Sequence, residues 1–139
     1  WGLVTSCPEG LLLPSGRIIR YPSLRMEEDG TWPDGRPKRS MFYAHGRHKA
    51  RITGPKACEN IVQALARDVI FDNALQFFQS TGLRPQLRVH DELVYVVPDK
   101  DAQPMLDELQ RIMRTPPKWW PELVVWSEGD VGQTYGSVK

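Results

Sequence analysis

The chain has 139 residues, of which 40% are hydrophobic and 25% are charged, a composition ordinary for a soluble globular protein. It contains no run of the roughly 18 apolar residues that a membrane-spanning helix needs, so we expect a cytoplasmic protein with no membrane partner. The two cysteines, Cys7 and Cys58, stand far apart without histidine neighbours at ligand spacing, which argues against a zinc site and favours reduced thiols.

The net charge of +1 conceals two halves of opposite sign. Residues 1–56 hold ten Lys or Arg against five acids, while residues 57–139 hold eight against twelve. The most basic stretch, residues 36–56, carries seven Lys or Arg and two histidines with no acid, and Phe42 and Tyr43 lie within it. Such a stretch suits contacts with nucleic-acid phosphates, although a solvated hairpin could have the same composition.

The N-terminal third is predicted to form β-hairpins, within residues 11–53. The apolar runs of residues 11–24 are broken by "PSG", which predicts a strand, a turn and a second strand. Residues 27–38 contain two Asp-Gly pairs and two prolines, which predict a loop. The runs "MFYAH" and "KARIT" then predict a second hairpin that turns at Gly46.

Residues 54–82 predict a long amphipathic helix. Pro55 suits the first helical position, and Gly82 suits the residue that ends a helix. The apolar residues recur at spacings of three and four, so one stripe is expected to face a core. A second face carries Asn60, Gln63 and Arg67, a row of neutral and basic hydrogen-bonding groups that could equally be an ordinary wet surface.

Residues 86–98 predict another hairpin, and residues 99–139 a helix followed by a final strand. The helix is expected over residues 99–114, and the strand at "VVWSEG". Between them lies a connector rich in proline, in which Trp119 and Trp120 are expected to pack. The sequence therefore predicts a single α+β domain, an antiparallel β-sheet with the long helix and the second helix packed on one face.

The hairpin turn places His90, Asp91 and Glu92 between two apolar strands. Adjacent carboxylates raise each other's pKa unless water or a cation screens them. A divalent metal removes that cost, and magnesium prefers one or two carboxylates together with phosphate oxygens. The three residues alone are also compatible with an ordinary polar turn.

A resemblance to a known family gives this turn its context. "VHDE" follows a helix that reads "GPKACENIVQALARD", and the pair resembles the palm of the family A DNA polymerases, those related to bacterial DNA polymerase I. This helix is similar to that of the family's phage branch, whose pattern is GKxxENxVQAxARD. The segments "LPSGRIIRYP" and "LVVWSEGDVGQTYG" also resemble parts of that family in the same order, so the resemblance covers roughly residues 11–136.

The resemblance implies roles for individual residues. Asp91 matches the palm aspartate that binds the catalytic magnesium ions, Glu92 a supporting acid, and His90 a histidine beside the primer terminus. Gln63 and Asn60 match helix residues that face the minor groove, where an amide can check base pairing without reading sequence. The residues that remain, Arg17, Lys56 and Arg67, are candidates for contacts with the DNA.

The family's second palm aspartate has no match here, because Arg20 stands where that aspartate would be. Its fingers helix has no match in the sequence either. We therefore expect a second polypeptide, or an N-terminal portion, to supply these parts and the thumb. The expected partners are primer–template DNA and a deoxynucleoside triphosphate. Two alternatives remain at this stage: a non-catalytic nucleic-acid-binding remnant, and an HD-type metallophosphohydrolase that uses His90 and Asp91 with His45 or His48.

Overall fold

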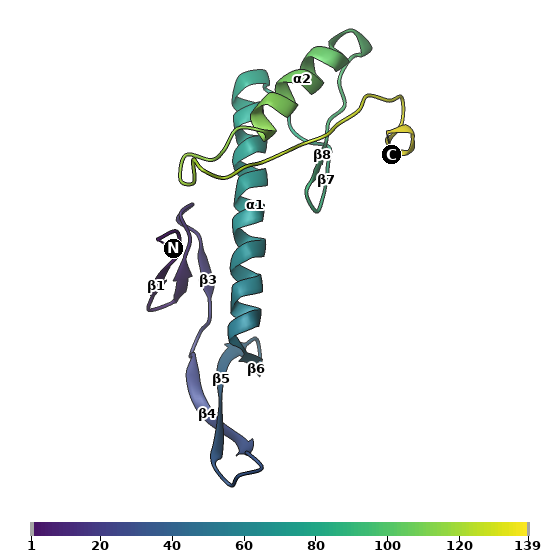
Figure 1. Cartoon of the computed structure of the whole chain (residues 1–139). Coiled ribbons are helices and arrows are strands. Elements are labelled where there is room, and N and C mark those ends of the chain that lie inside the picture. Colours follow the sequence, from purple (N-terminus) through teal and green to yellow (C-terminus); the bar gives the residue numbers. More distant parts are fainter. Residues whose placement is uncertain (1, 139) are drawn as a thin grey trace. The chain divides into compact units, whose positions relative to one another are not determined.

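The computed structural model describes residues 2–138, and the chain divides into two compact units at a boundary between Ala66 and Arg67. The elements mix helices with antiparallel strands, so the predicted α+β class is confirmed (Figure 1). The strands form three separate antiparallel sheets in the described residues, of three, three and two strands. No helix within residues 2–138 combines the length and apolar character needed to cross a membrane.

The first unit contains two sheets and the start of the long helix. The first sheet has the order β1-β2-β3 and the second the order β4-β5-β6. The strands are β1 (Thr5–Cys7), β2 (Gly10–Leu12), β3 (Ile18–Arg20), β4 (Arg25–Thr31), β5 (Pro37–His45) and β6 (His48–Ile52). The strand–turn–strand prediction is confirmed by β2 and β3, and the predicted turn at Gly46 by β5 and β6, whose last pair is His45 with His48.

The prediction of a loop over residues 27–38 is wrong at both ends, and only residues 32–36 lie outside a strand. Residues as far as Thr31 belong to β4, which pairs with β5. Of the two Asp-Gly pairs, Asp34-Gly35 lies in the turn, where the Gly35 N–H donates to the Trp32 carbonyl at 2.9 Å. Gly30 instead lies in a register irregularity inside the strand, with φ of 95°. A bulge uses the same left-handed backbone as a turn, which is why the sequence signal was the same.

The long helix α1 spans Gly54–Thr81, one residue short of the predicted range. Gly82 takes φ of 74°, and its N–H donates to the Phe78 carbonyl at 2.8 Å, which ends the helix as glycine was expected to do. The predicted apolar stripe is only partly buried: Val69 and Phe77 are buried, but Val62 is 60% exposed. A single stripe assumes one core, whereas α1 passes through two compact units that each cover their own part of it.

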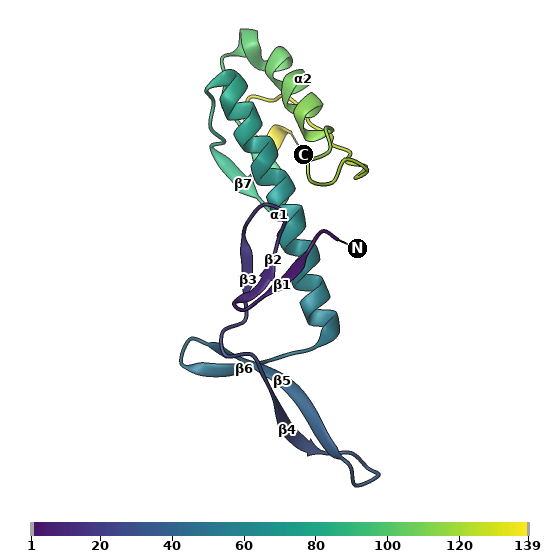
Figure 2. The same cartoon turned by 90° about the vertical axis from the view of Figure 1, so that its left-hand side faces the viewer.

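In the second unit, the helix α2 (Ala102–Met113) packs on the C-terminal part of α1 (Figures 1 and 2). Phe77 of α1 is 1% exposed and forms a buried cluster with Leu109 and Ile112 of α2. A short 3-10 turn, η1 (Asp99–Asp101), precedes α2, so the predicted second helix is confirmed.

The second unit also holds the third sheet, a hairpin of β7 (Leu87–Val89) and β8 (Glu92–Val94). Leu93 and Tyr95 pack against the Phe77 cluster, and the Phe77 and Tyr95 rings lie 4.7 Å apart between centroids. Alternate residues of a strand share a face, so one face of this arm is fixed to the core.

The final strand predicted at "VVWSEG" is wrong, because residues 124–129 pair with no strand in the described chain. Arg114, the residue that follows α2, holds this segment instead. The Arg114 guanidinium donates to the Ser127 carbonyl at 2.7 and 3.1 Å and lies 4.2 Å from the centre of the Trp126 ring. An arginine fork therefore satisfies a carbonyl that a neighbouring strand would otherwise have bonded. The predicted packing of Trp119 agrees with its indole N–H, which donates to Asp72 at 3.1 Å.

We expect Phe77→Ala to lower the free energy of unfolding of the second unit by about 3–5 kcal/mol, because it leaves a cavity between α1 and α2. Leu75→Ala is the matched control on the same helix, since Leu75 is 54% exposed, and it should cost less than about 1 kcal/mol. Urea unfolding followed by circular dichroism measures both changes. Equal losses for the two variants would contradict the assignment of the core.

Candidate functional site

The tip of the β7–β8 hairpin carries the predicted catalytic residues. Val89 pairs with Glu92, so His90 and Asp91 form a two-residue turn. His90 adopts φ of 52°, a left-handed conformation that is uncommon outside glycine. Because both residues lie in the turn, strand alternation does not determine the directions of their side chains.

The three polar residues of the tip have different surroundings. His90 and Asp91 are exposed, while Glu92 is half-buried. The Tyr135 hydroxyl donates a hydrogen bond to a Glu92 carboxylate oxygen at 2.7 Å. The hairpin therefore presents one exposed carboxylate, Asp91, next to a second one that is already bonded to the protein.

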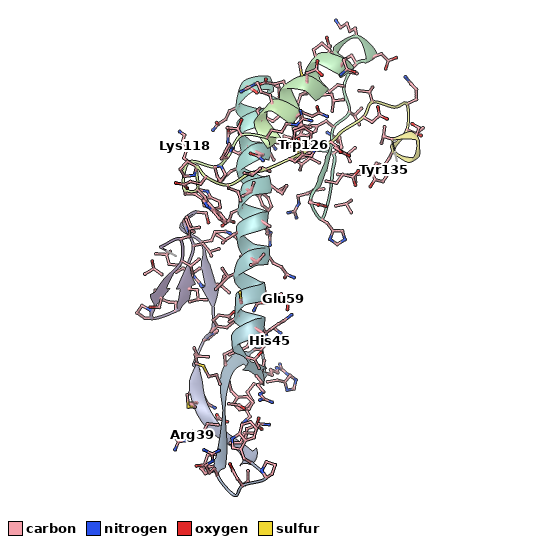
Figure 3. All side chains as sticks on the ribbon, in the orientation of Figure 1. Arg39, His45, Glu59, Lys118, Trp126 and Tyr135 are labelled. Atoms are coloured by element: carbon pink, nitrogen blue, oxygen red, sulfur yellow. The ribbon has the colours of Figure 1, made fainter. Side chains whose placement is uncertain are left out.

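Tyr135 begins the C-terminal 3-10 turn η2 (Tyr135–Ser137), where Figure 3 labels it. Thr134 and Ser137 close this turn: the Thr134 N–H donates to the Ser137 hydroxyl at 3.2 Å, and that hydroxyl donates to the Thr134 carbonyl at 2.7 Å. The role of Tyr135 could not be predicted from the sequence, because a tyrosine in a glycine-rich tail carries no signal for a contact with a residue 43 positions earlier.

Among residues 2–138, no group of three or more His, Cys, Asp or Glu side chains is arranged to hold a metal ion. The donors at the tip still fit magnesium in part, since the ion commonly uses one or two protein carboxylates and completes its shell with water and phosphate oxygens. Asp91 would be the direct ligand. Glu92, with one oxygen bonded to Tyr135, is better placed to support it.

The predicted DNA-facing row on α1 is only partly free. Lys56 forms an ion pair with Glu59 at 2.8 Å, and the Gln63 amide donates to the same carboxylate at 3.2 Å. The Asn60 amide donates to the Tyr21 hydroxyl at 2.9 Å. Glu59 thus brings Lys56 and Gln63 together, while Asn60 ties the helix to the residue that follows β3.

The two predicted arginines differ in their contacts. The Arg17 guanidinium donates to the Ala64 carbonyl of α1 at 3.2 Å, so part of its hydrogen-bonding capacity serves the first unit. Arg67 belongs to the second unit, where its guanidinium lies 5.1 Å from the centre of the Phe71 ring. Arg67 donates no hydrogen bond from its side chain in the described part of the chain.

The basic stretch of residues 36–56 is substantially neutralised by acids. Lys49 pairs with Glu27, and Arg51 lies 3.4 Å from Asp29, so two acids of β4 meet two cations of β6. The Lys49 ammonium, followed by Arg25, holds the pKa of Glu27 below its ordinary value. Within residues 2–138, three basic residues of this stretch form no ion pair: Lys38, Arg39 and Arg47.

The chain is 31% identical over 142 aligned residues to a DNA polymerase of Bacillus phage SP02, an alignment that covers 96% of this chain. It is related to a region of a phage DNA polymerase. The chain spans only 21% of the length of that relative. No protein-family model matches the chain, and no solved structure matches it.

Replacing Tyr135 with Phe removes the hydroxyl that holds Glu92 and keeps the ring. Because Glu92 is partly solvated, we expect a loss of about 1 kcal/mol in the free energy of unfolding, less than the roughly 1.5–3 kcal/mol of a typical hydrogen bond to a charged group. The amide signals of residues 90–92 in a nitrogen–proton NMR spectrum should shift or broaden. Tyr43→Phe in the first unit is the control, and should leave those signals in place. Unchanged signals in Tyr135→Phe would contradict the contact.

Proposed function

We propose that the chain is the C-terminal palm portion of a family A DNA polymerase of the phage type. The observation that carries the proposal is the exposed carboxylate of Asp91 at the tip of a hairpin fixed to the core, in a chain similar over 96% of its length to a phage DNA polymerase. The turn geometry also weakens the HD-type alternative, since His90 and Asp91 lie between strands and not on helices.

In the proposed reaction, Asp91 contributes one carboxylate to a site for two magnesium ions. Such ions supply charge stabilisation for the attacking and leaving oxygens of a phosphoryl transfer. Glu92, oriented by Tyr135, places a second carboxyl group beside Asp91 and supports it. His90, exposed on the same turn, contacts the primer terminus.

The surface of α1 is proposed to face the duplex. Gln63 is exposed, and its amide keeps one hydrogen after donating the other to Glu59. Asn60 keeps one amide hydrogen and its carbonyl after bonding Tyr21. Both can test the minor-groove acceptors that every base pair presents. Phosphate contacts are assigned to Lys56, Arg17 and Arg67, and the incoming substrate is a deoxynucleoside triphosphate.

This reading requires further protein. A two-metal site needs carboxylates from both palm strands to hold the ions roughly 3.5–4 Å apart. The position that would carry the second aspartate holds Arg20. We propose that a second polypeptide, or a preceding portion of a longer chain, provides that aspartate, the fingers and the thumb.

The 139-residue chain by itself should therefore extend no primer. Incorporation of a labelled deoxynucleotide on a primer–template, with magnesium and then with manganese, measures this. The commercially purified large fragment of a bacterial DNA polymerase I serves as the positive control under the same conditions. Template-directed incorporation by the isolated chain would contradict the division of the site between two parts.

When the missing aspartate, fingers and thumb are supplied by a second polypeptide, the reconstituted enzyme should lose more activity with Asp91→Asn than with Glu92→Gln. The reason is that Asp91 binds metal directly. Loss of a supporting group typically costs about 10- to 100-fold, which is the range expected for Glu92→Gln. Single-turnover incorporation at saturating magnesium compares the two variants. If Asp91→Asn keeps the larger share of activity, the roles of the two carboxylates are reversed. If both variants keep full activity, the chain acts as a non-catalytic nucleic-acid-binding part.

A further inference from the structure

Three arginines of the second unit lie against phenylalanine rings of α1. The Arg67 and Arg88 guanidiniums both stack on Phe71, at 5.1 and 4.5 Å from the ring centre. Arg84 lies 5.2 Å from the centre of the Phe78 ring. We call these three residues, Arg67, Arg84 and Arg88, the arginine row.

The two rings give the row its direction. Phe71 and Phe78 are seven residues apart on one helix, about two turns, so they share a face and are separated by about 10.5 Å along the axis. After α1 the chain turns back, so that residue 84 lies by the later ring and residue 88 by the earlier one. Figure 2 shows this segment descending beside α1 into β7. The row therefore follows the helix.

The guanidiniums of the row have unused hydrogen-bonding capacity. Contact with an aromatic ring engages the cationic group without consuming its N–H donors, so a guanidinium keeps a fork that fits a phosphate in two-point fashion. Within residues 2–138, none of the three side chains forms an ion pair or donates a hydrogen bond. Arg111 in the same unit is different, since it donates two hydrogen bonds of 2.7 Å to Glu108.

The placement of these charges is unexpected for the composition of the unit. From Arg67 onward the chain has eight Lys or Arg against eleven Asp or Glu, a net charge of −3. Three cations nevertheless gather along one helix face without a carboxylate partner in the described residues. Phe71, which carries two of them, is still 43% exposed, so the row lies at the surface.

We propose that the arginine row binds the sugar–phosphate backbone of a nucleic-acid strand. The two rings lie about 10.5 Å apart along α1, so the arginines beside them can reach different phosphates of one strand. Arg67 and Arg88 then share one phosphate group or two adjacent ones, and Arg84 contacts a phosphate further along the strand. The choice of nucleic acid as the ligand rests on the proposed function. The available N–H donors and the positive charge of the arginine row are observations that do not depend on it.

A purely structural role makes a different prediction. Arginine stems and guanidiniums also cover apolar rings that would otherwise meet water. In that case the row would affect the stability of the unit but not its affinity for DNA. Binding and stability must therefore be measured on the same variants.

The test uses the full 139-residue chain and short fluorescent oligonucleotides, one single-stranded and one a primer–template duplex. Fluorescence anisotropy gives the binding constant between about 50 and 200 mM salt, and each phosphate contact contributes about 0.7 to 0.9 to the slope of log affinity against log salt. We expect the triple variant Arg67→Gln, Arg84→Gln, Arg88→Gln to lower that slope by about 2 to 3. Arg111→Gln removes one exposed charge of the same type and should change the slope by less than about 0.5.

A second triple variant, with Lys in place of each arginine, separates charge from the fork. We expect it to keep most of the slope and to bind more weakly than the original chain, because an ammonium cannot form the two-point contact. Thermal unfolding of every variant by circular dichroism confirms the fold. If the glutamine variant unfolds, the Lys variant and the single variant Arg84→Gln provide the comparison, with a slope change of about 1 expected for the latter.

Three results would overturn the proposal. One is an unchanged slope in the folded glutamine variant. Another is the absence of DNA binding by the original chain. The third is equal affinity for polyglutamate of matched charge, which would assign the row to acidic proteins. The outcome is separable from that of the proposed function, since a changed slope combined with full activity of Asp91→Asn would retain the arginine row and discard the catalytic role.

Discussion

The contact between Phe77 of α1 and the α2 residues Leu109 and Ile112 determines what the second unit can do. It is the most deeply buried point of that unit, and Leu93 and Tyr95 extend it to the β8 arm. A two-stranded hairpin is marginal in water without such support. Apolar contacts thus hold the tip in place, and its two exposed side chains, His90 and Asp91, are not needed for that task.

The cost of this arrangement is visible at Tyr95. Its ring packs on Phe77, but its buried hydroxyl has no hydrogen-bond partner in the described residues. Burial also raises the pKa of this hydroxyl above its ordinary value of 10.0. The ring contributes apolar area next to the core, and the unbonded hydroxyl offsets part of that gain.

Local sequence signals predicted the helices and most of the strands. Features that depend on contacts between distant residues could not be predicted in this way. Gly82 and the periodic apolar residues were sufficient for α1, and Gly46 for its hairpin. A charge count along the sequence overstates the free charge of the basic stretch, because the Asp-Gly pairs and prolines of residues 27–38 predict a loop and not a paired strand. Once β4 is a strand, Glu27 and Asp29 lie beside Lys49 and Arg51 and neutralise charge that a count along the sequence treats as free.

For the candidate site, too, the sequence predicted one part and not the other. The types and order of His90, Asp91 and Glu92 could be taken from the sequence together with their resemblance to a polymerase motif. Their different environments could not, because these depend on the turn geometry and on Tyr135. The final strand failed for a related reason: Arg114 bonds the Ser127 carbonyl, and nothing in the local sequence distinguishes a carbonyl bonded by a side chain from one bonded by a strand.

Because Tyr135 must reach Glu92, the geometry of the site depends on the length of the segment that leads to Tyr135. The chain between Ser127, held by Arg114, and Thr134, which opens the closing turn, must have the reach that brings one hydroxyl to one carboxylate. An insertion or deletion of a single residue in this stretch would retain every functional group and still separate the two. Among related sequences, conservation of spacing here should therefore matter as much as conservation of residue identity.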